Sequence, residues 1–88
     1  MDLPSGYGPD TEIDDEGMDP VWKQLAAILL ARIEAEVYPA GRAIPSLTQL
    51  LQEFGVSRGT VLKATGYLED AGVLRAVQGR GVFVLPKQ

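Results

Sequence analysis

The sequence contains no cysteine and no histidine among its 88 residues. Without cysteine there are no disulfide bonds or thiolate metal sites, and without histidine the most common general base and metal ligand are both missing. We therefore expect no metal, no other cofactor and no enzymatic activity. The longest apolar run, residues 25–31, is far shorter than the ~20 residues that span a bilayer. No secretory signal opens the chain, so we expect a cytoplasmic protein with no membrane partner.

Charge is divided unequally along the chain. Residues 1–19 hold seven carboxylates and no basic side chain, whereas residues 20–88 hold eight basic side chains against five acidic ones. The net charge of −4 therefore averages over a strongly acidic tail and a mildly basic remainder. Such asymmetry is a hint about partners, and the basic part is compatible with nucleic acid.

The composition also suggests where the folded part begins. Residues 1–18 contain three glycines, two prolines and six acids with few apolar side chains, too little apolar surface to order the segment. We predict a disordered acidic tail over residues 1–18 and one folded domain over residues 19–86, because a chain of this length suffices for one domain only.

A first helix is predicted from Asp19 to about Val37. Asp19 is a suitable N-cap, and Pro20 is tolerated at the first helical position because its missing N–H needs no partner there. Apolar residues then recur at steps of three and four, as on the buried stripe of an amphipathic helix. These residues, which we interpret as core, are Trp22, Leu25, Leu29 and Ile33.

Two further helices follow across a very tight turn. Ser46 and Gln49 form a Ser-x-x-Gln capping box at the start of the second, and Gly55 suits the left-handed position after its end. Ser57 then caps a third helix that extends to about Ala71. The predicted buried side of the third helix comprises Val61, Ala64, Leu68 and Ala71.

The chain finishes with a predicted β-hairpin. The short apolar runs at residues 73–74 and 82–85 flank the glycine-bearing stretch 78–81. Three helices followed by a two-stranded wing give an α+β fold, the winged helix-turn-helix.

The opening turn of the third helix carries small polar and basic side chains, which suit contacts with phosphates and base edges in the major groove. They are Ser57, Arg58 and Thr60. On their own these residues are better explained by an N-cap and a solvated charge, because capping alone accounts for serine and threonine at a helix start. The hairpin tip, Gln78-Gly79-Arg80, favours the DNA interpretation, because glycine permits close approach to a backbone or groove.

Several blocks of residues carry a family resemblance. They are Ile44-Pro45-Ser46, Phe54-Gly55-Val56-Ser57-Arg58, Thr60-Val61, Gly72-Val73-Leu74 and Gln78-Gly79-Arg80-Gly81-Val82-Phe83-Val84. In this order and spacing, over about residues 20–85, the chain resembles the DNA-binding domain of the GntR family of bacterial transcription regulators. The resemblance implies a recognition helix (about 57–71) in the major groove and a wing glycine in the minor groove. By position it implies DNA contacts from Arg58, Thr60, Gln78, Gly79 and Arg80.

The chain also departs from that family. Thr48 and Leu62 stand where the family often has arginine, and Lys63 follows Leu62. We include Ser46, Thr48, Ser57, Leu62 and Lys63 in the predicted DNA-binding set. The family usually adds a C-terminal effector-binding or dimerising domain. Because none follows here, we expect no effector ligand and a monomer that pairs weakly, if at all, on DNA.

Together these observations predict sequence-specific binding of duplex DNA by a bacterial transcription regulator, a repressor. The alternative is a winged helix used for protein interaction, with the acidic tail engaging a partner or masking the DNA surface. Exposed Leu62, modest basicity and the tail favour this alternative. Retention of Arg58, Thr60 and the wing tip favours DNA.

Overall fold

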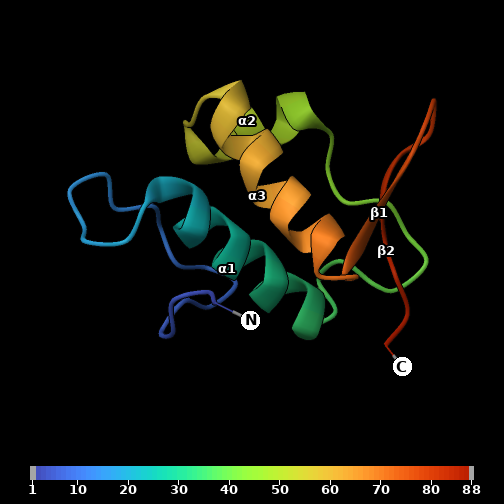
Figure 1. The fold of residues 1–88 in the computed structure, drawn as a ribbon, viewed down its shortest axis with the longest axis horizontal. Coiled ribbons are helices and arrows are strands. Elements are labelled where there is room, and N and C mark those ends of the chain that lie inside the picture. The colour runs from blue at the N-terminus through green and yellow to red at the C-terminus, as the bar shows by residue number, and fades with distance from the viewer. Residues whose placement is uncertain (1, 88) are drawn as a thin grey trace.

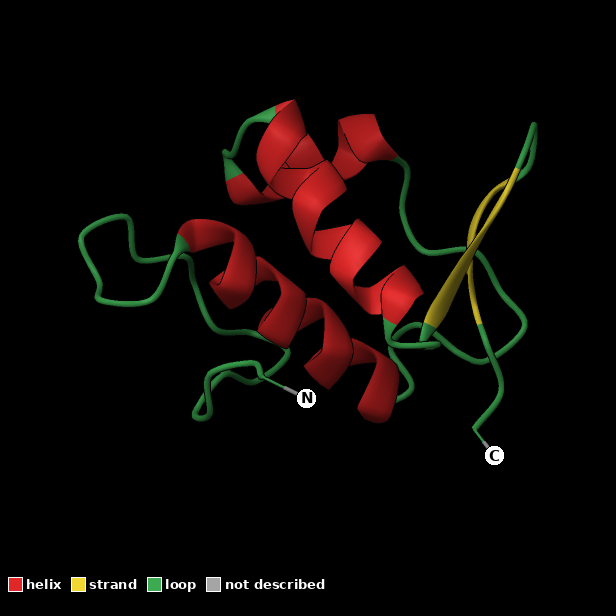
Figure 2. Ribbon diagram, viewed as in Figure 1, coloured by secondary structure: helices red, strands yellow, loops and turns green. Residues whose placement is uncertain are grey.

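A computed structural model describes residues 2–87. Its elements are α1 (Val21–Glu34), α2 (Leu47–Phe54), α3 (Arg58–Asp70), β1 (Leu74–Val77) and β2 (Gly81–Val84). Helix α3 is central, because it contacts α1, α2 and β1 (Figures 1 and 2). The predicted order of three helices and a two-stranded wing is confirmed. Across residues 2–87, no helix combines the length and apolar character needed to cross a membrane.

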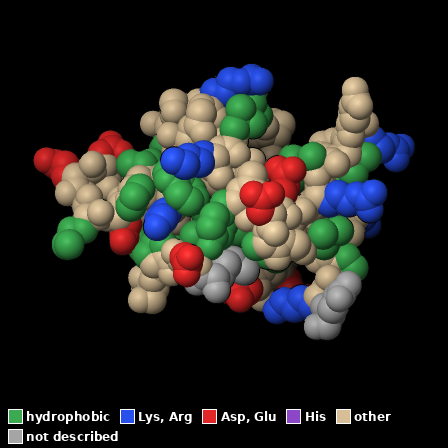
Figure 3. Space-filling view, in the orientation of Figure 1, with side chains coloured by type: hydrophobic (Ala, Val, Ile, Leu, Met, Phe, Trp, Pro, Cys, Tyr) green, Lys and Arg blue, Asp and Glu red, His purple; other side chains and the backbone are tan. Residues whose placement is uncertain are grey.

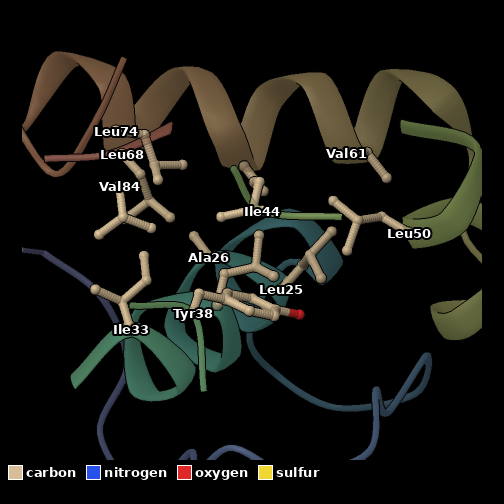
Figure 4. Close-up of a cluster of buried hydrophobic side chains, with 12 residues drawn as sticks. Leu25, Ala26, Ile33, Tyr38, Ile44, Leu50, Val61, Leu68, Leu74 and Val84 are labelled. Atoms are coloured by element: carbon tan, nitrogen blue, oxygen red, sulfur yellow. The ribbon is translucent and has the colours of Figure 1, made fainter. Parts of the chain in front are cut away.

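The core lies between α1, α3 and the sheet (Figure 4). Both helices contribute small side chains at their contact, since Ala26 and Ala64 are fully buried and let the backbones approach. The larger buried members are Leu25, Leu29, Ile33, Tyr38, Ile44, Leu50, Val61, Leu68, Leu74 and Val84. Two residues that were predicted to lie in the core are not buried. Trp22 is only partly buried and stacks at the surface on Tyr67, and Ala71 is exposed because it lies just beyond the end of α3.

The bounds of α1 differ from the prediction at both ends. Pro20, rather than Asp19, occupies the N-cap, and no side chain caps the helix. The Asp19 carboxylate instead accepts a hydrogen bond from the Tyr7 hydroxyl. The helix ends at Glu34, three residues early, because Glu36 takes a left-handed φ of 61° and Val37 N–H turns back to the carbonyl of Arg32.

The hairpin has the predicted turn and an additional neighbour. Leu74 pairs with Val84 and Val77 with Gly81, so residues 78–80 form the tip, closed by a hydrogen bond from Arg80 N–H to the Val77 carbonyl. Residues 41–44 lie along the other edge of β2, bonded to Val82 and Val84. This pairing, which the sequence pattern did not reveal, anchors the wing to the loop before α2.

The N-terminal segment, residues 2–20, makes contacts with the rest of the chain that its composition did not predict. It has no regular secondary structure, yet it runs along α1 (Figure 1), and its side chains Leu3 and Ile13 pack against the core. The backbone N–H of Asp2 donates to the Tyr67 hydroxyl of α3 (2.8 Å). Desolvation and the bond to Asp19 raise the pKa of Tyr7, which keeps this phenol a donor within the segment.

Helix α1 holds the segment through one stripe of side chains, Gln24, Ile28 and Arg32, each one turn from the next. Gln24 is fully buried; its amide accepts from Asp14 N–H and donates to the carbonyls of Asp14 and Asp19. Ile28, between the two polar residues, is also fully buried. Composition failed here because these bonds join backbone groups of the segment, which any sequence possesses, to polar side chains placed by α1.

Arg32 connects the segment to the helices. Its Nε donates to the Pro9 carbonyl (2.9 Å), its Nη1 to the Tyr38 hydroxyl (2.7 Å), and its Nη2 pairs with Glu53 of α2 (2.6 Å). The guanidinium also lies 4.9 Å from the centre of the Phe54 ring. The hydrogen bond to Glu53 raises the pKa of Arg32 further above its ordinary value, so the group stays charged.

We expect Gln24→Ala to lower the free energy of unfolding by about 1–3 kcal/mol, because it leaves buried backbone groups of the segment without partners. Urea denaturation followed by circular dichroism measures the change. The matched control is Gln52→Ala, which removes an exposed glutamine of α2 and should shift stability by less than about 0.5 kcal/mol. Equal effects of the two substitutions would show that the segment adds nothing to stability.

Candidate nucleic-acid interface

Local sequence fixes the junction between α2 and α3. The predicted capping box is confirmed: Gln49 N–H donates to Ser46 Oγ, and Ser46 N–H donates to the Gln49 side chain. Gly55 adopts the left-handed conformation (φ 63°) that ends α2. Ser57 then accepts from Thr60 N–H, as an N-cap does. These caps set the residue at which α3 starts.

Packing decides which face of α3 is free. Val61, Ala64, Thr65 and Leu68 are buried against the core. The opposite face exposes Arg58, Gly59, Leu62 and Lys63. Leu62 is 49% exposed, so its apolar side chain is not part of the core. An exposed leucine between exposed cations suits a contact surface.

The hydroxyls at the start of α3 are already partly engaged. Ser57 Oγ and Thr60 Oγ1 lie 3.0 Å apart and share a hydrogen bond. Ser57 is exposed and Thr60 half-buried. Each oxygen keeps hydrogen-bonding capacity for a further partner.

The remaining predicted residues of the helices occupy different places. Ser46 and Thr48 are exposed at the start of α2, where Ser46 serves as the cap. Lys63 is exposed, but its ammonium lies 4.9 Å from the centre of the Trp22 ring, on the side of α3 that faces α1. Lys63 therefore does not occupy the position of the missing arginine at residue 62.

The wing tip presents Gln78, Gly79 and Arg80, all exposed. Gly79 has a φ of 78°, and a Cβ built there would meet no atom within 4 Å. Glycine is thus favoured by backbone conformation, and the tip is open to an approaching partner. The start of α3 and the wing tip both reach the upper edge of the molecule in Figure 1, which brings the two predicted groups onto one side.

Charged side chains of both signs are spread over the face shown in Figure 3. Lys and Arg lie at the upper edge and over the wing, with others in the left half and below, and Asp and Glu lie at the left edge, near the middle and along the lower part. Within residues 2–87 the single salt bridge joins Arg32 to Glu53, so Arg58 and Arg80 keep their charges free for a partner. No group of three or more carboxylates in this part of the chain is arranged to hold a metal ion.

Two exposed cations near the wing were missed by the sequence analysis. Arg75 follows buried Leu74 on β1, and the alternation of a strand could have revealed it. Arg42 lies in the stretch that pairs with β2. Because that pairing is an isolated contact between distant segments, no local signal pointed to Arg42.

The N-terminal segment does not bond to this surface. Apart from the bonds from Lys23 and Gln24 N–H to the Pro20 carbonyl, its hydrogen bonds to the rest of the described chain end on Gln24, Arg32 and Tyr67. Arg58 and the wing tip stay exposed. The masking of this surface by the acidic segment, the alternative suggested by charge, finds no support in these contacts.

Comparison with known proteins agrees with this geometry. Residues 22–84 match the model of the family described as "Bacterial regulatory proteins, gntR family". The chain is 35% identical over 68 residues to the mannosyl-D-glycerate transport/metabolism system repressor MngR of Escherichia coli (strain K12), covering 77% of this chain and 28% of MngR.

Solved structures are also similar. YtrA from Sulfolobus acidocaldarius, a GntR-family transcription factor, has a TM-score of 0.78 and 34% identity, covering 88% of this chain and 81% of YtrA. The DNA-binding domain of AraR in complex with operator ORX1 has a TM-score of 0.76 and 33% identity, covering 84% of this chain and 98% of that domain. The chain spans about a quarter of the length of the curated relatives it matches.

The cap of α3 gives a direct test of how this site is built. We expect Ser57→Ala to lower the free energy of unfolding by about 1 kcal/mol, because Thr60 N–H loses its acceptor. Ser57→Asp should retain stability, since aspartate caps equally well and its charge suits the helix N-terminus. Thermal and urea denaturation of both variants measure this. Unchanged stability of the alanine variant would contradict the capping role.

Proposed function

The chain belongs to the gntR family of bacterial regulatory proteins, and from this premise we propose that it binds a specific operator in duplex DNA through α3 and the wing. The observation that carries the proposal is the shared edge on which the start of α3 and the wing tip lie, with Arg58 and Arg80 exposed and without a salt bridge to any described carboxylate. The operator complex of the AraR domain, which has the same fold, supports it.

In this proposal α3 and the wing make different contacts with DNA. The major groove is wide enough to admit a helix, so the exposed face of α3 would lie there with Arg58 and Leu62 toward the base edges. Ser57, Thr60 and the free N–H groups of the first turn suit a backbone phosphate. Gly79, with no side chain, lets the wing approach a groove or backbone closely.

We further propose that the regulator acts as a repressor in the cytoplasm, where bacterial DNA lies. MngR, which shares 35% identity over the matched region, is named a repressor. A protein bound to an operator can block access to the adjacent promoter without any catalytic group.

The free chain is proposed to be monomeric at micromolar concentration. One recognition helix and one wing cover a single half-site, so a two-fold operator requires two copies. Any pairing of copies on DNA would depend on adjacent half-sites.

We expect Arg58→Ala to weaken operator binding by about 1–3 kcal/mol, because a charge-assisted contact to phosphate or guanine is lost. Stability should stay unchanged, since the side chain is exposed. Fluorescence anisotropy with labelled duplex measures affinity, and urea denaturation measures stability. Lys87→Ala, which removes an exposed cation from the stretch after β2, is the matched control. A loss of stability equal to the loss of affinity would instead make Arg58 a structural residue.

We expect the unmodified protein to prefer A·T at the base pair facing Leu62, because an apolar side chain can contact the thymine methyl but cannot donate to guanine. Leu62→Arg should shift the preference to guanine and raise affinity. Selection of binding sites from a randomised duplex library measures the base preference and the affinity of each variant. Val37→Arg, at an exposed apolar position outside α3 (55% exposed), controls for added charge. Selection of guanine by the unmodified protein at that pair would refute the assignment.

A further inference from the structure

The guanidinium of Arg32, in the last turn of α1, gives each of its three nitrogens a different partner. Nε donates to the Pro9 carbonyl of the N-terminal segment (2.9 Å), Nη1 donates to the Tyr38 hydroxyl (2.7 Å), and Nη2 pairs with Glu53 of α2 (2.6 Å). A guanidinium is planar and its N–H bonds point in fixed directions, so it cannot turn toward one partner without leaving another. The three contacts of Arg32 therefore depend on one another.

Arg32 contacts the last two residues of α2. Besides pairing with Glu53, the guanidinium lies 4.9 Å from the centre of the Phe54 ring, and a cation is attracted to the face of an aromatic ring. Gly55 follows directly and ends the helix. Three residues separate Phe54 from Arg58, the first residue of α3. The contacts of Arg32 therefore hold the turn from which the exposed face of α3 begins.

The N-terminal segment presents the Pro9 carbonyl to Arg32 from a short turn that closes on itself. Thr11 N–H donates to the Gly8 carbonyl (3.2 Å), and Gly8 N–H donates to Thr11 Oγ1 (2.8 Å). A hollow of about 440 Å³ lies between residues 10–13 and the end of α2, with Arg32 in its lining. Within residues 2–87 the hydrogen-bonded route from the segment to α2 runs through Arg32.

Docking of the segment strengthens the hold of Arg32 on α2. With the segment in place the Arg32 side chain is 13% exposed, although the Glu53 side chain is 43% exposed. A charge pair that is shielded from water and salt is stronger than the same pair in solvent. Without the Pro9 carbonyl, Nε would lose its fixed acceptor and the guanidinium could rotate away from Glu53. The start of α3 would then move more freely, and ordering it on DNA would cost more conformational entropy.

We propose that Arg32 makes operator affinity depend on docking of the N-terminal segment, which thereby acts as an internal activator of DNA binding. Arg32 and Glu53 are positioning residues for α3 and touch no DNA. The inference rests on the proposed DNA binding and adds an effect that charge alone would give the opposite sign. The seven carboxylates of the segment should repel DNA, whereas docking through Arg32 favours the binding geometry. Because linkage is reciprocal, DNA must favour docking of the segment by the same factor.

The test uses the whole chain and changes the turn of the segment without changing its charge. Thr11→Val keeps the size of the side chain but removes the oxygen that accepts from Gly8, which loosens the presentation of the Pro9 carbonyl. We expect its affinity to fall about fivefold, the low end of the usual range for coupled sites. Thr11→Ser keeps the oxygen and should bind as the unmodified protein does. Arg32→Lys keeps the charge but lacks the planar fork, so it should also bind about fivefold more weakly.

Affinity is measured by fluorescence anisotropy with a labelled duplex selected from the randomised library, at a temperature where urea denaturation shows each variant to be folded. Amide hydrogen exchange supplies a measurement that a merely structural role would not change. Saturation with this duplex should slow the exchange of Thr11 N–H, which closes the turn, by about the same factor of five. In Arg32→Lys the slowing should be smaller.

The outcomes separate this inference from the proposed function. Thr11→Val and Arg32→Lys that bind as tightly as the unmodified protein, or exchange at Thr11 that duplex does not slow, would overturn the coupling and leave DNA binding intact. Tighter binding by Thr11→Val would also overturn it and would show that the segment acts through its charge. Failure of the unmodified protein to bind any duplex of the library at low salt would instead refute the proposed function itself.

Discussion

The close packing of α3 on α1 determines the rest of the molecule. Ala26 and Ala64 are fully buried at this contact, and Leu25, Leu29, Val61 and Leu68 fill the space around them. Because α3 has one buried face, its opposite face is fixed as well, and Arg58 and Leu62 are held outward without any contact of their own. A larger side chain at Ala64 would separate the helices and turn α3 on its axis. The direction of every exposed side chain of α3 thus depends on residues that no partner touches.

Short-range constraints add precision to this arrangement. The capping box at Ser46, the left-handed Gly55 and the cap at Ser57 together determine where α2 stops and α3 starts. On the other side, the pairing of residues 41–44 with β2 holds the hairpin in place. The distance between the start of α3 and the wing tip is therefore set by packing and caps rather than by flexible loops. A rigid pair of contact elements loses little conformational entropy on binding.

The N-terminal segment carries seven of the twelve carboxylates of the chain. Its seven carboxylates could approach the basic surface if the segment were free. Instead, Gln24 and Arg32 hold its backbone along α1. The segment lies outside the residues 22–84 that match the gntR family model. Polyanionic DNA would be repelled from the acidic side and attracted to the α3 side, which favours one orientation of encounter.

The sequence by itself determined the elements whose signals are local. Helix periodicity, the caps at Ser46 and Ser57, and the glycines at 55 and 79 depend on residues a few positions apart, and the structure has them as predicted. The exposure of Leu62 followed from the same periodicity. Tertiary structure alone decided the order of the N-terminal segment, the pairing of residues 41–44 with β2, and the direction of Lys63 toward Trp22. Each of these joins groups far apart in the chain, often through backbone atoms that are the same in every residue, so no local pattern of side chains could encode them.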